Sequence, residues 1–334
     1  MTEPEPSVTP SRPSREDLEK AILGESPGLT AREVAHASDV PVDQARRLWR
    51  ALGFPEHGGE PAFTAADVEA LRQVTQLVGA GMLDFDTALN LTRAVGQTMA
   101  RLADWEVGTL VDVIEHIESS DAARGSRMST AMVLAEQVNP AFEQLLLYAW
   151  RRHLAASAAR VEALGAHDEA LSTALVTVGF ADMVAFTALS NQLDEGRIGD
   201  LVEVFESRCA DIVAAHGGRV IKSLGDSVLF VHESPAAALA MADGIVDKIG
   251  RDPRMPDVRL GLATGPVVLR MGDVFGRPVN LAARLTAVAR RNRVIVDQAT
   301  ADGLPSEEYA VRHLPPRPIR GFGLIEPLAV RRHP

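Results

Sequence analysis

A predicted β-hairpin over residues 219–230 carries two charged side chains that can do chemistry. Its two short apolar runs are separated by Gly225-Asp226, a pattern typical of a tight turn between antiparallel strands. The turn places the Asp226 carboxylate at the hairpin tip and the Lys222 ammonium in the preceding strand. The chain uses Arg 31 times and Lys only three times, which favours a role for Lys222 that needs a compact point charge rather than a planar guanidinium.

A second acid, Asp182, is predicted to lie beside Asp226. It follows the predicted strand 175–180 by two residues, whereas Asp226 directly precedes the second strand of the hairpin. Each acid alone is also typical of a turn. In the strand order derived below, however, the end of the first strand lies next to the start of the third. Two convergent carboxylates without cysteine or clustered histidine suit Mg²⁺ or Mn²⁺ better than Zn²⁺.

Cationic side chains and free amides are predicted near these acids. Residues 181–187 turn into a short helix whose first amides can face phosphate oxygens. Arg259, on a later strand, and Arg320, near the C-terminus, can neutralise a polyphosphate. Divalent metal, arginines and amides together indicate a site for a nucleoside triphosphate.

The spacing of apolar residues along the chain changes after about residue 170, and this change predicts the elements that position these residues. The second half, residues 171–334, predicts an α+β domain with an antiparallel sheet in the β-α-β-β-α-β order of a ferredoxin-like fold. In this order strand one lies antiparallel beside strand three. Beyond strand 175–180 and the hairpin, the predicted helices are 197–215, 235–249 and 278–290, and the predicted strands are 258–264, continued by 267–271, and 294–296.

The first half predicts an all-helical domain over residues 18–138, after a disordered tail at 1–17 that is rich in Pro and Ser. Residues 29–53 are similar to the helix-turn-helix of the mercury-resistance-regulator family, and the second helix carries three arginines, Arg46, Arg47 and Arg50. The segment nevertheless holds only four bases against three acids. A structural unit without a DNA partner is therefore favoured, and DNA binding is unlikely.

A linker helix is predicted over residues 139–170, with Asn139-Pro140 as its cap and first turn. It carries His153, a candidate regulatory residue because histidine can titrate between pH 5 and 8; a solvated surface histidine is the alternative. An apolar stripe on this helix indicates a dimer seam or a lever between the two halves, or simply packing on its own domain. The stripe consists of Leu147, Trp150, Leu154, Ala158 and Val161.

Composition limits the class of protein. At 334 residues and 46% hydrophobic, the chain is long enough for two cores. No apolar run has the roughly 18 residues of a membrane span, so a cytoplasmic protein is expected. Residues 1–170 carry 26 acids and 15 bases, whereas residues 171–334 carry 19 of each. The chain as a whole is therefore a poor polyanion binder, and only a local patch can hold phosphate.

Three segments of the second half resemble the signature segments of class III nucleotidyl cyclases, in order and at suitable spacing. They are Phe180-Ala-Asp-Met-Val-Ala-Phe-Thr187, Lys222-Ser-Leu-Gly-Asp226 and Asp273-Val-Phe-Gly-Arg-Pro-Val-Asn-Leu-Ala-Ala-Arg284. The likeness covers about residues 171–334. It extends, less closely, to soluble actinobacterial cyclases in which an N-terminal helical domain restrains the catalytic domain.

The resemblance implies a role for each matching residue. Asp182 and Asp226 match the two metal-binding aspartates, and the Met183 carbonyl is an expected further ligand. The remaining matches are Lys222 and Asp273 for the purine, Asn280 for the ribose, Arg284 for the α-phosphoryl charge, and Arg259 and Arg320 for the triphosphate. The implied reaction is attack of the ribose 3′-hydroxyl on the α-phosphorus, assisted by two Mg²⁺ or Mn²⁺ ions per active site.

A lysine donor and an aspartate acceptor fit the N1 and N6 edge of adenine, whereas guanine presents the reverse pattern. The expected substrate is therefore ATP and the expected product cyclic AMP. Family catalytic domains pair head to tail, which implies a homodimer with two shared sites. One residue departs from the family, because Ala185 stands where Gly is usual. The alternative is a DNA-binding or signalling regulator whose cyclase-like domain only senses nucleotide.

Overall fold

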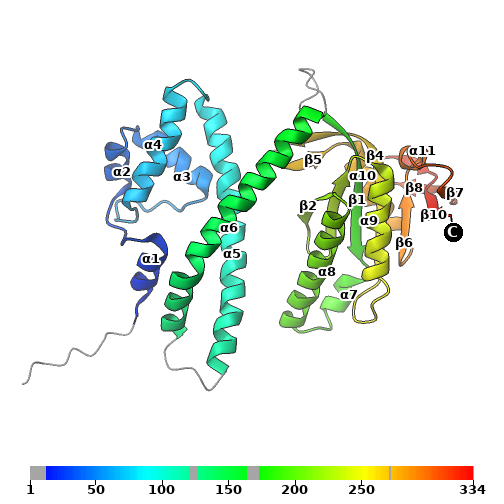
Figure 1. The fold of residues 1–334 in the computed structure, drawn as a ribbon, viewed down its shortest axis with the longest axis horizontal. Helices are drawn as coiled ribbons and strands as arrows, with labels where there is room; N and C mark the ends of the chain where they lie inside the picture. The colour runs from blue at the N-terminus through cyan, green and yellow to red at the C-terminus, as the bar shows by residue number, and fades with distance from the viewer. Residues whose placement is uncertain (1–12, 120–126, 164–172, 271, 334) are drawn as a thin grey trace, which may run out of the picture. The chain divides into compact units, whose positions relative to one another are not determined.

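The computed structural model describes residues 13–119, 127–163, 173–270 and 272–333. Backbone contacts divide the chain into two compact units, Met1–Ser157 and Ala158–Pro334. Each unit is described by itself (Figure 1). Residues 164–170 of the predicted linker helix and the first twelve residues of the predicted disordered tail lie outside the described residues.

The first unit is helical, as predicted. Its helices are α1 (Arg15–Leu23), α2 (Ala31–Ala37), α3 (Val42–Leu52), α4 (Ala65–Gly79), α5 (Phe85–Ser119) and α6 (Arg127–Ala163). The predicted helix-turn-helix is α2 and α3, with Asp39 in the turn at a φ of 58° and Gly53 ending α3 at a φ of 84°. The core of this unit centres on Leu48, Trp49 and Phe63.

The predicted tail is too long at its C-terminal end, because α1 already begins at Arg15. Ser14 and Asp17 form a capping box: the Asp17 carboxylate accepts hydrogen bonds from the Ser14 amide and hydroxyl, each at 2.8 Å. Reciprocal capping satisfies two amides that otherwise remain open at a helix start. The helix therefore starts inside the Pro- and Ser-rich stretch.

The start predicted for the linker helix is also wrong, because α6 begins at Arg127 and runs through Pro140. Proline normally marks a first helical turn, since it lacks an amide hydrogen. Here the preceding residues 127–138 contain no glycine or proline and continue the helical pattern, and Ala135 is buried. The helix therefore continues through Pro140 despite the loss of the one hydrogen bond that proline cannot donate.

The three arginines of the helix-turn-helix are engaged with acids of the same unit. Arg46 lies 3.9 Å from Asp43, and Arg50 lies 3.8 Å from Glu56. Arg47 lies 3.3 Å from Asp86 and stacks over the ring of Phe85. Their positive charge is locally compensated, which leaves little basic surface for a phosphate backbone.

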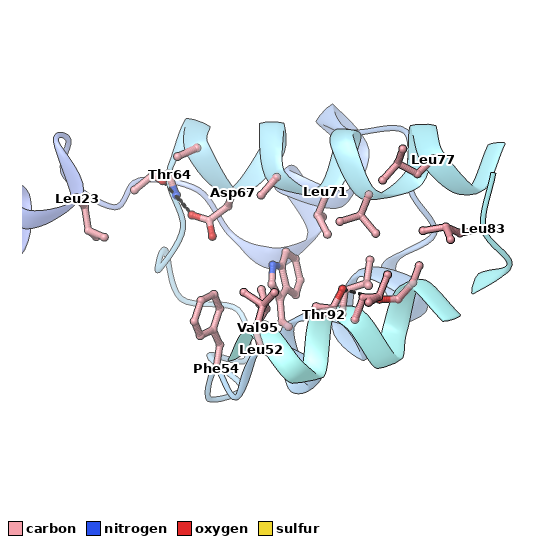
Figure 2. A pocket seen from close by; sticks show the side chains of 17 residues that line it. Leu23, Leu52, Phe54, Thr64, Asp67, Leu71, Leu77, Leu83, Thr92 and Val95 are labelled. Carbon is pink, nitrogen blue, oxygen red and sulfur yellow. Dashed lines mark hydrogen bonds between the residues drawn. The ribbon is translucent and has the colours of Figure 1, made fainter. Parts of the chain in front are cut away.

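An apolar cavity of about 480 Å³ lies between α3, α4 and α5 of the first unit (Figure 2). Trp49, Leu71 and Val95 are among its lining residues. Its lining, as far as the structure describes it, contains no Lys, Arg or His, and its acid, Asp67, already accepts hydrogen bonds from the Thr64 amide and hydroxyl. An apolar cavity of this kind favours uncharged, apolar occupants over water.

The second unit is built on a sheet with the strand order β2-β3-β1-β4-β6-β10-β7, and β5 pairs with β4. The antiparallel order β2-β3-β1-β4 confirms the predicted ferredoxin-like arrangement, with strand one beside strand three. The strands of this sheet are β1 (Thr173–Met183), β2 (Arg219–Ser223), β3 (Ser227–His232), β4 (Val258–Arg270), β5 (Asp273–Phe275), β6 (Arg293–Val296), β7 (Tyr309–His313) and β10 (Leu328–Arg332). A separate pair, β8 (Arg317–Ile319) and β9 (Gly323–Ile325), forms a small hairpin.

Helices cover both faces of this sheet. One core lies between the sheet and α8 (Glu195–Ala215) with α9 (Pro235–Lys248), and the other lies under α10 (Arg277–Val288). Two short helices, α7 (Phe186–Ser190) and α11 (Gln298–Asp302), complete the unit. Side chains of β1 alternate between the cores: Val178 packs toward α10, and Met183 packs toward α8 and α9.

Close packing of α10 on the sheet depends on a glycine in β4. A Cβ at Gly261 would lie 2.4 Å from the Thr286 amide nitrogen, so only glycine fits without moving the helix. The Thr286 hydroxyl lies within hydrogen-bond distance of two carbonyls, that of Ala282 in its own helix at 2.9 Å and that of Phe180 in β1 at 3.3 Å. The C-terminal end of α10 is thereby held over the ends of β1 and β4, where the predicted acids lie.

Among the described residues, no helix is both long and apolar enough to cross a bilayer. The one cysteine, Cys209, is fully buried in α8, and burial raises the pKa of its thiol to about 12. It is therefore a small core residue rather than a nucleophile.

Candidate active site

The two predicted acids lie on adjacent strand ends. Asp182 of β1 is the register partner of Ser227, the residue that follows Asp226. The Met183 amide donates to the Asp226 carbonyl at 2.9 Å, which ties the two segments together. The turn is as predicted: Gly225 has a φ of 73°, and the Leu224 amide donates to the Ser227 carbonyl. Strand β1 is longer than predicted, because it runs through both Asp182 and Met183.

Asp182 lies in a partly buried position, with its side chain 18% exposed. Burial raises the pKa of this carboxyl above its usual range, and the nearby negative charge of Asp226 raises it further; the Arg259 guanidinium acts in the opposite direction. The register and the backbone contact between Met183 and Asp226 place both acids at the same end of β1 and β3, where both could approach one bound cation.

Arg259 lies directly across from Asp182 in the register of β4 with β1. Its Nε atom donates to Asp182 Oδ2 at 2.6 Å, and its Nη1 atom donates to the Ala287 carbonyl in the last turn of α10 at 3.3 Å. The predicted triphosphate-binding arginine therefore lies at the acid pair, in contact with one of the acids. A guanidinium in this position can also meet anionic oxygens held near the acids.

The two acids form a fitting but incomplete site for a hard divalent cation. Carboxylates together with a backbone carbonyl such as that of Met183 are the oxygen ligands that Mg²⁺ and Mn²⁺ take. In the part of the chain that the structure describes, no group of three or more His, Cys, Asp or Glu side chains could hold a metal ion. Mg²⁺ is often bound by one or two carboxylates, with water and substrate phosphates completing its shell. The residues present fit that arrangement.

Lys222 and Asp273 form an ion pair. A shift in the pairing of β2 with β3 between Val220 and Lys222 brings Lys222 opposite Leu229, whose side chain packs on the α10 face of the sheet. Lys222 Nζ lies 2.6 Å from Asp273 Oδ2. Burial acts to raise the pKa of Asp273, but hydrogen bonds from Lys222 and the Val274 amide outweigh it and hold that pKa below its usual range. The predicted purine-binding pair is thus preassembled.

The predicted set of free amides near the acids is smaller than expected. The Met183 amide is used by Asp226, and the Val184 amide donates to the Asp257 carbonyl at 2.7 Å. The short helix α7 begins only at Phe186, after Ala185. Any phosphate contact from this segment is therefore restricted to amides from Ala185 onward.

Ala185 adopts a left-handed backbone conformation, with a φ of 59° and a ψ of 28°. This conformation costs a non-glycine residue roughly 1–2 kcal/mol because Cβ crowds the following carbonyl. Glycine suits this position because it has no Cβ to be crowded. Ala185 adopts the same conformation at the cost of this strain.

We expect the substitution Ala185→Gly to stabilise the second unit by up to about 1 kcal/mol, because relief of the left-handed strain exceeds the entropy that glycine adds to the unfolded chain. Gly225→Ala is the matched control, since Gly225 has a φ of 73° and open space around its missing Cβ. It should destabilise the unit by a similar amount. Urea unfolding followed by circular dichroism measures both; a less stable Ala185→Gly protein would contradict this account.

Asn280 and Arg284 lie one turn apart on α10, and both are exposed. The residues next to them, Leu281 and Leu285, are buried against the sheet. Asn280 and Arg284 therefore form an outward polar face of α10.

The structure does not bring every predicted residue to the acids. Arg320 is exposed in the turn between β8 and β9, and no hydrogen bond or ion pair among the described residues links it to Asp182 or Asp226. His153 is exposed on α6, in the first unit.

One supporting residue was missed by the sequence analysis. Asn292, at a φ of 52°, accepts a hydrogen bond from the Val258 amide and donates to Asp257 Oδ1 at 2.7 Å and to the Gly250 carbonyl at 2.8 Å. It fixes Asp257, whose carbonyl holds the Val184 amide after the acid-bearing strand. The signal available in the sequence was an asparagine in a polar turn before a strand, which is too common to single out.

Known proteins resemble this chain over most of its length. A family model described as the adenylate and guanylate cyclase catalytic domain matches residues 169–328. An adenylate cyclase of Streptomyces coelicolor is 37% identical over 99% of this chain and 94% of its own length. An adenylate cyclase of Streptomyces griseus is 35% identical over 94% of this chain and 88% of its own length. A pH-sensitive adenylate cyclase of Mycobacterium tuberculosis is 28% identical over 91% of this chain and 78% of its own length.

Proposed function

This chain belongs to the adenylate and guanylate cyclase family, and we propose that it is an adenylyl cyclase, a lyase that converts ATP to cyclic AMP and pyrophosphate. The observation that carries the proposal is the position of Asp182 and Asp226 on adjacent strand ends, beside Arg259. The names of the relatives, two of them adenylate cyclases over nearly their full length, support the same activity.

In this proposal the acid pair and the Met183 carbonyl hold the divalent ions, either Mg²⁺ or Mn²⁺. When bound, two such ions would lower the pKa of the ribose 3′-hydroxyl and neutralise the triphosphate. Arg259 binds the triphosphate, and for Arg320, exposed in the turn between β8 and β9, the same role rests on the family resemblance alone. The 3′-oxygen attacks the α-phosphorus, the bond to the bridging oxygen breaks, and pyrophosphate leaves.

Lys222 and Asp273 select the base. The Lys222 ammonium donates to adenine N1, and the Asp273 carboxylate accepts from the N6 amino group. Their 2.6 Å ion pair supports this role because it holds a donor and an acceptor side by side. Guanine would meet a donor with its own donor there, leaving polar groups unpaired.

Asn280 and Arg284, like Lys222 and Asp273, act on the nucleotide bound at the aspartates of a partner subunit. Both are exposed on α10, which supports contacts outside their own subunit. Asn280 orients the ribose, and Arg284 stabilises the charge that develops on the α-phosphoryl group. A head-to-tail homodimer then contains two equivalent sites, each built from both chains.

The test of this assignment is the product formed by purified protein from ATP and from GTP, with Mg²⁺ and with Mn²⁺. Cyclic AMP from ATP, with little cyclic GMP from GTP, is expected. A preference for GTP would contradict the base assignment, and the absence of both products would contradict the enzyme.

The alternative function, a DNA-binding regulator that only senses nucleotide, has less support. It depended on Arg46, Arg47 and Arg50, and each of these lies within 4 Å of an acid of the same unit.

We infer that the first unit restrains the catalytic unit, with α6 as the connection, since this helix continues from one unit into the other. The apolar stripe on α6 supports a lever or a dimer seam rather than packing within its own unit. Leu147, Trp150 and Leu154 are each more than half exposed.

The first unit would respond to pH or to a small ligand, and the structure lends more support to a ligand. His153 is exposed, as expected of a solvated surface histidine. The cavity of about 480 Å³ in the first unit offers space for an uncharged apolar molecule (Figure 2).

We predict that residues 168–334 alone are more active than the full chain between pH 5 and 8. Both forms should lose activity toward acid pH, because burial raises the pKa of Asp182 and protonation removes a metal ligand. The ratio of the two rates isolates the effect of the first unit. Equal rates and equal pH profiles would remove any regulatory role.

A further inference from the structure

The charged side chains assigned to the nucleotide and its metal ions are paired with one another. Arg259 Nε lies 2.6 Å from Asp182 Oδ2, and Lys222 Nζ lies 2.6 Å from Asp273 Oδ2. In each pair, a cationic group that is expected to bind the nucleotide contacts an acid. The consequences differ, because Lys222 and Asp273 bind the same base, whereas Arg259 and Asp182 are assigned different ligands.

Arg259 contacts Oδ2 of Asp182, and a divalent ion on either oxygen of this carboxylate would lie close to the guanidinium. A cation at Asp182 Oδ2 would lie within a few ångströms of the guanidinium charge, and like charges at that distance repel strongly in a partly buried site. Within the described residues no third His, Cys, Asp or Glu joins the two acids, so an Asp182 carboxylate held by Arg259 leaves a weak ligand set for a metal.

The position of Arg259 is determined by the sheet and by a helix. It is the register partner of Asp182, so its Cα cannot move away without breaking β1–β4 pairing. Its Nη1 atom is held by the Ala287 carbonyl in the last turn of α10. The guanidinium can therefore leave Asp182 only by rotation of its own side chain, which is one third exposed.

We propose that Arg259 is a switch that occupies the metal-binding carboxylate of Asp182 in the empty site and moves to the triphosphate when nucleotide binds. This inference rests on the proposed function. The triphosphate is an anion that can compete with Asp182 for Arg259. Metal and nucleotide then bind cooperatively, because each favours the state in which Arg259 has left Asp182.

The switch also links the acids to α10. When Arg259 leaves, the Ala287 carbonyl loses a donor, and this carbonyl belongs to the helix that carries Asn280 and Arg284. Binding of metal and nucleotide at one site therefore changes the hydrogen bonding at the end of α10, the helix that presents Asn280 and Arg284 to the partner subunit.

The test measures Mn²⁺ binding to the full-length protein by electron paramagnetic resonance, with Mn²⁺ alone and then with 3′-deoxy-ATP, which lacks the attacking hydroxyl. For the wild type we expect weak binding of Mn²⁺ alone and at least tenfold tighter binding with the nucleotide, after correction for Mn²⁺ held by free nucleotide. Arg259→Ala should bind Mn²⁺ alone about tenfold more tightly than the wild type and show a smaller gain from nucleotide, because only the gain from ligation by the phosphates remains.

Arg251→Ala is the matched control, since it removes an exposed arginine that pairs with Asp247 at 2.8 Å and lies outside the site. It should leave both affinities unchanged. Arg259→Gln, which keeps a hydrogen-bond donor without the charge, should fall between wild type and Arg259→Ala, and replaces the latter if that protein does not fold.

Asp182→Asn separates this inference from the proposed function. If Asp182→Asn leaves Mn²⁺ binding unchanged, Asp182 is not a metal ligand and the proposed metal site is wrong. If Asp182→Asn abolishes binding but the Arg259 variants bind Mn²⁺ no more tightly than the wild type, the metal site stands and the switch is contradicted.

Discussion

Replacing Lys222 by Glu should lower kcat/KM for ATP by at least about a hundredfold, with an upper range of about 10⁴ to 10⁵ for a base edge left unpaired. The change puts a second acid beside Asp273, whose Oδ2 lies 2.6 Å from the Lys222 ammonium in the wild type. Two acids cannot donate to adenine N1, and their repulsion opens the pair. Initial rates of cyclic AMP formation measure the effect.

Lys248→Glu is the matched control for this substitution. Lys248 is one of the other two lysines of the chain and lies exposed in the last turn of α9. Its replacement makes the same change in net charge and should leave the rate within about twofold, as expected for surface positions. Unchanged activity of Lys222→Glu would discard the assignment of Lys222 to the base.

Mixing Asp226→Ala subunits with Arg284→Ala subunits should restore about a quarter of the wild-type activity, although each variant alone is nearly inactive. Loss of a group that stabilises the transition state costs about 10²- to 10³-fold. In a head-to-tail dimer, half of the randomly mixed dimers are mixed, and each of these holds one site with both defects and one site with none. One intact site in half of the dimers amounts to a quarter of the intact sites of the wild type, so the expected recovery follows from the symmetry alone.

The control for this experiment mixes Asp226→Ala with Asp182→Ala. Both substitutions affect the same half of the site, since Asp182 and Asp226 lie on adjacent strand ends of one chain. No intact site can form in the mixed dimer, and no activity should return. If the first mixture also stays inactive while differently tagged subunits exchange, the site is not shared across the interface.

Local sequence patterns predicted the elements that carry the acids. Gly225 at a positive φ produced a hairpin with Asp226 in its turn, and the fold order placed Asp182 beside it. The helix-turn-helix was equally predictable, because Asp39 and Gly53 both adopt the left-handed conformation that turn and cap positions require.

Features that depend on tertiary partners were not predictable. Strand β1 extends to Met183 because β3 and β4 pair with it on both sides, which overrides the turn preference of an aspartate after an apolar run. The edge strand β7 has no strong pattern of its own, since its residues after Tyr309 are exposed, and β10 lies between it and β6. The Arg259–Asp182 pair, between residues 77 positions apart, emerges only from the register.

The most direct test of the central claim, that Asp182 and Asp226 form the catalytic centre of an ATP cyclase, is a paired rate measurement. Full-length wild type and Asp226→Asn are incubated with ATP and Mg²⁺ or Mn²⁺, and cyclic AMP and pyrophosphate are quantified, with circular dichroism to check the fold. The account predicts equal amounts of both products from the wild type and at least about a hundredfold less from the variant. Equal rates from the two proteins, or no cyclic AMP from the wild type with either metal, would contradict it.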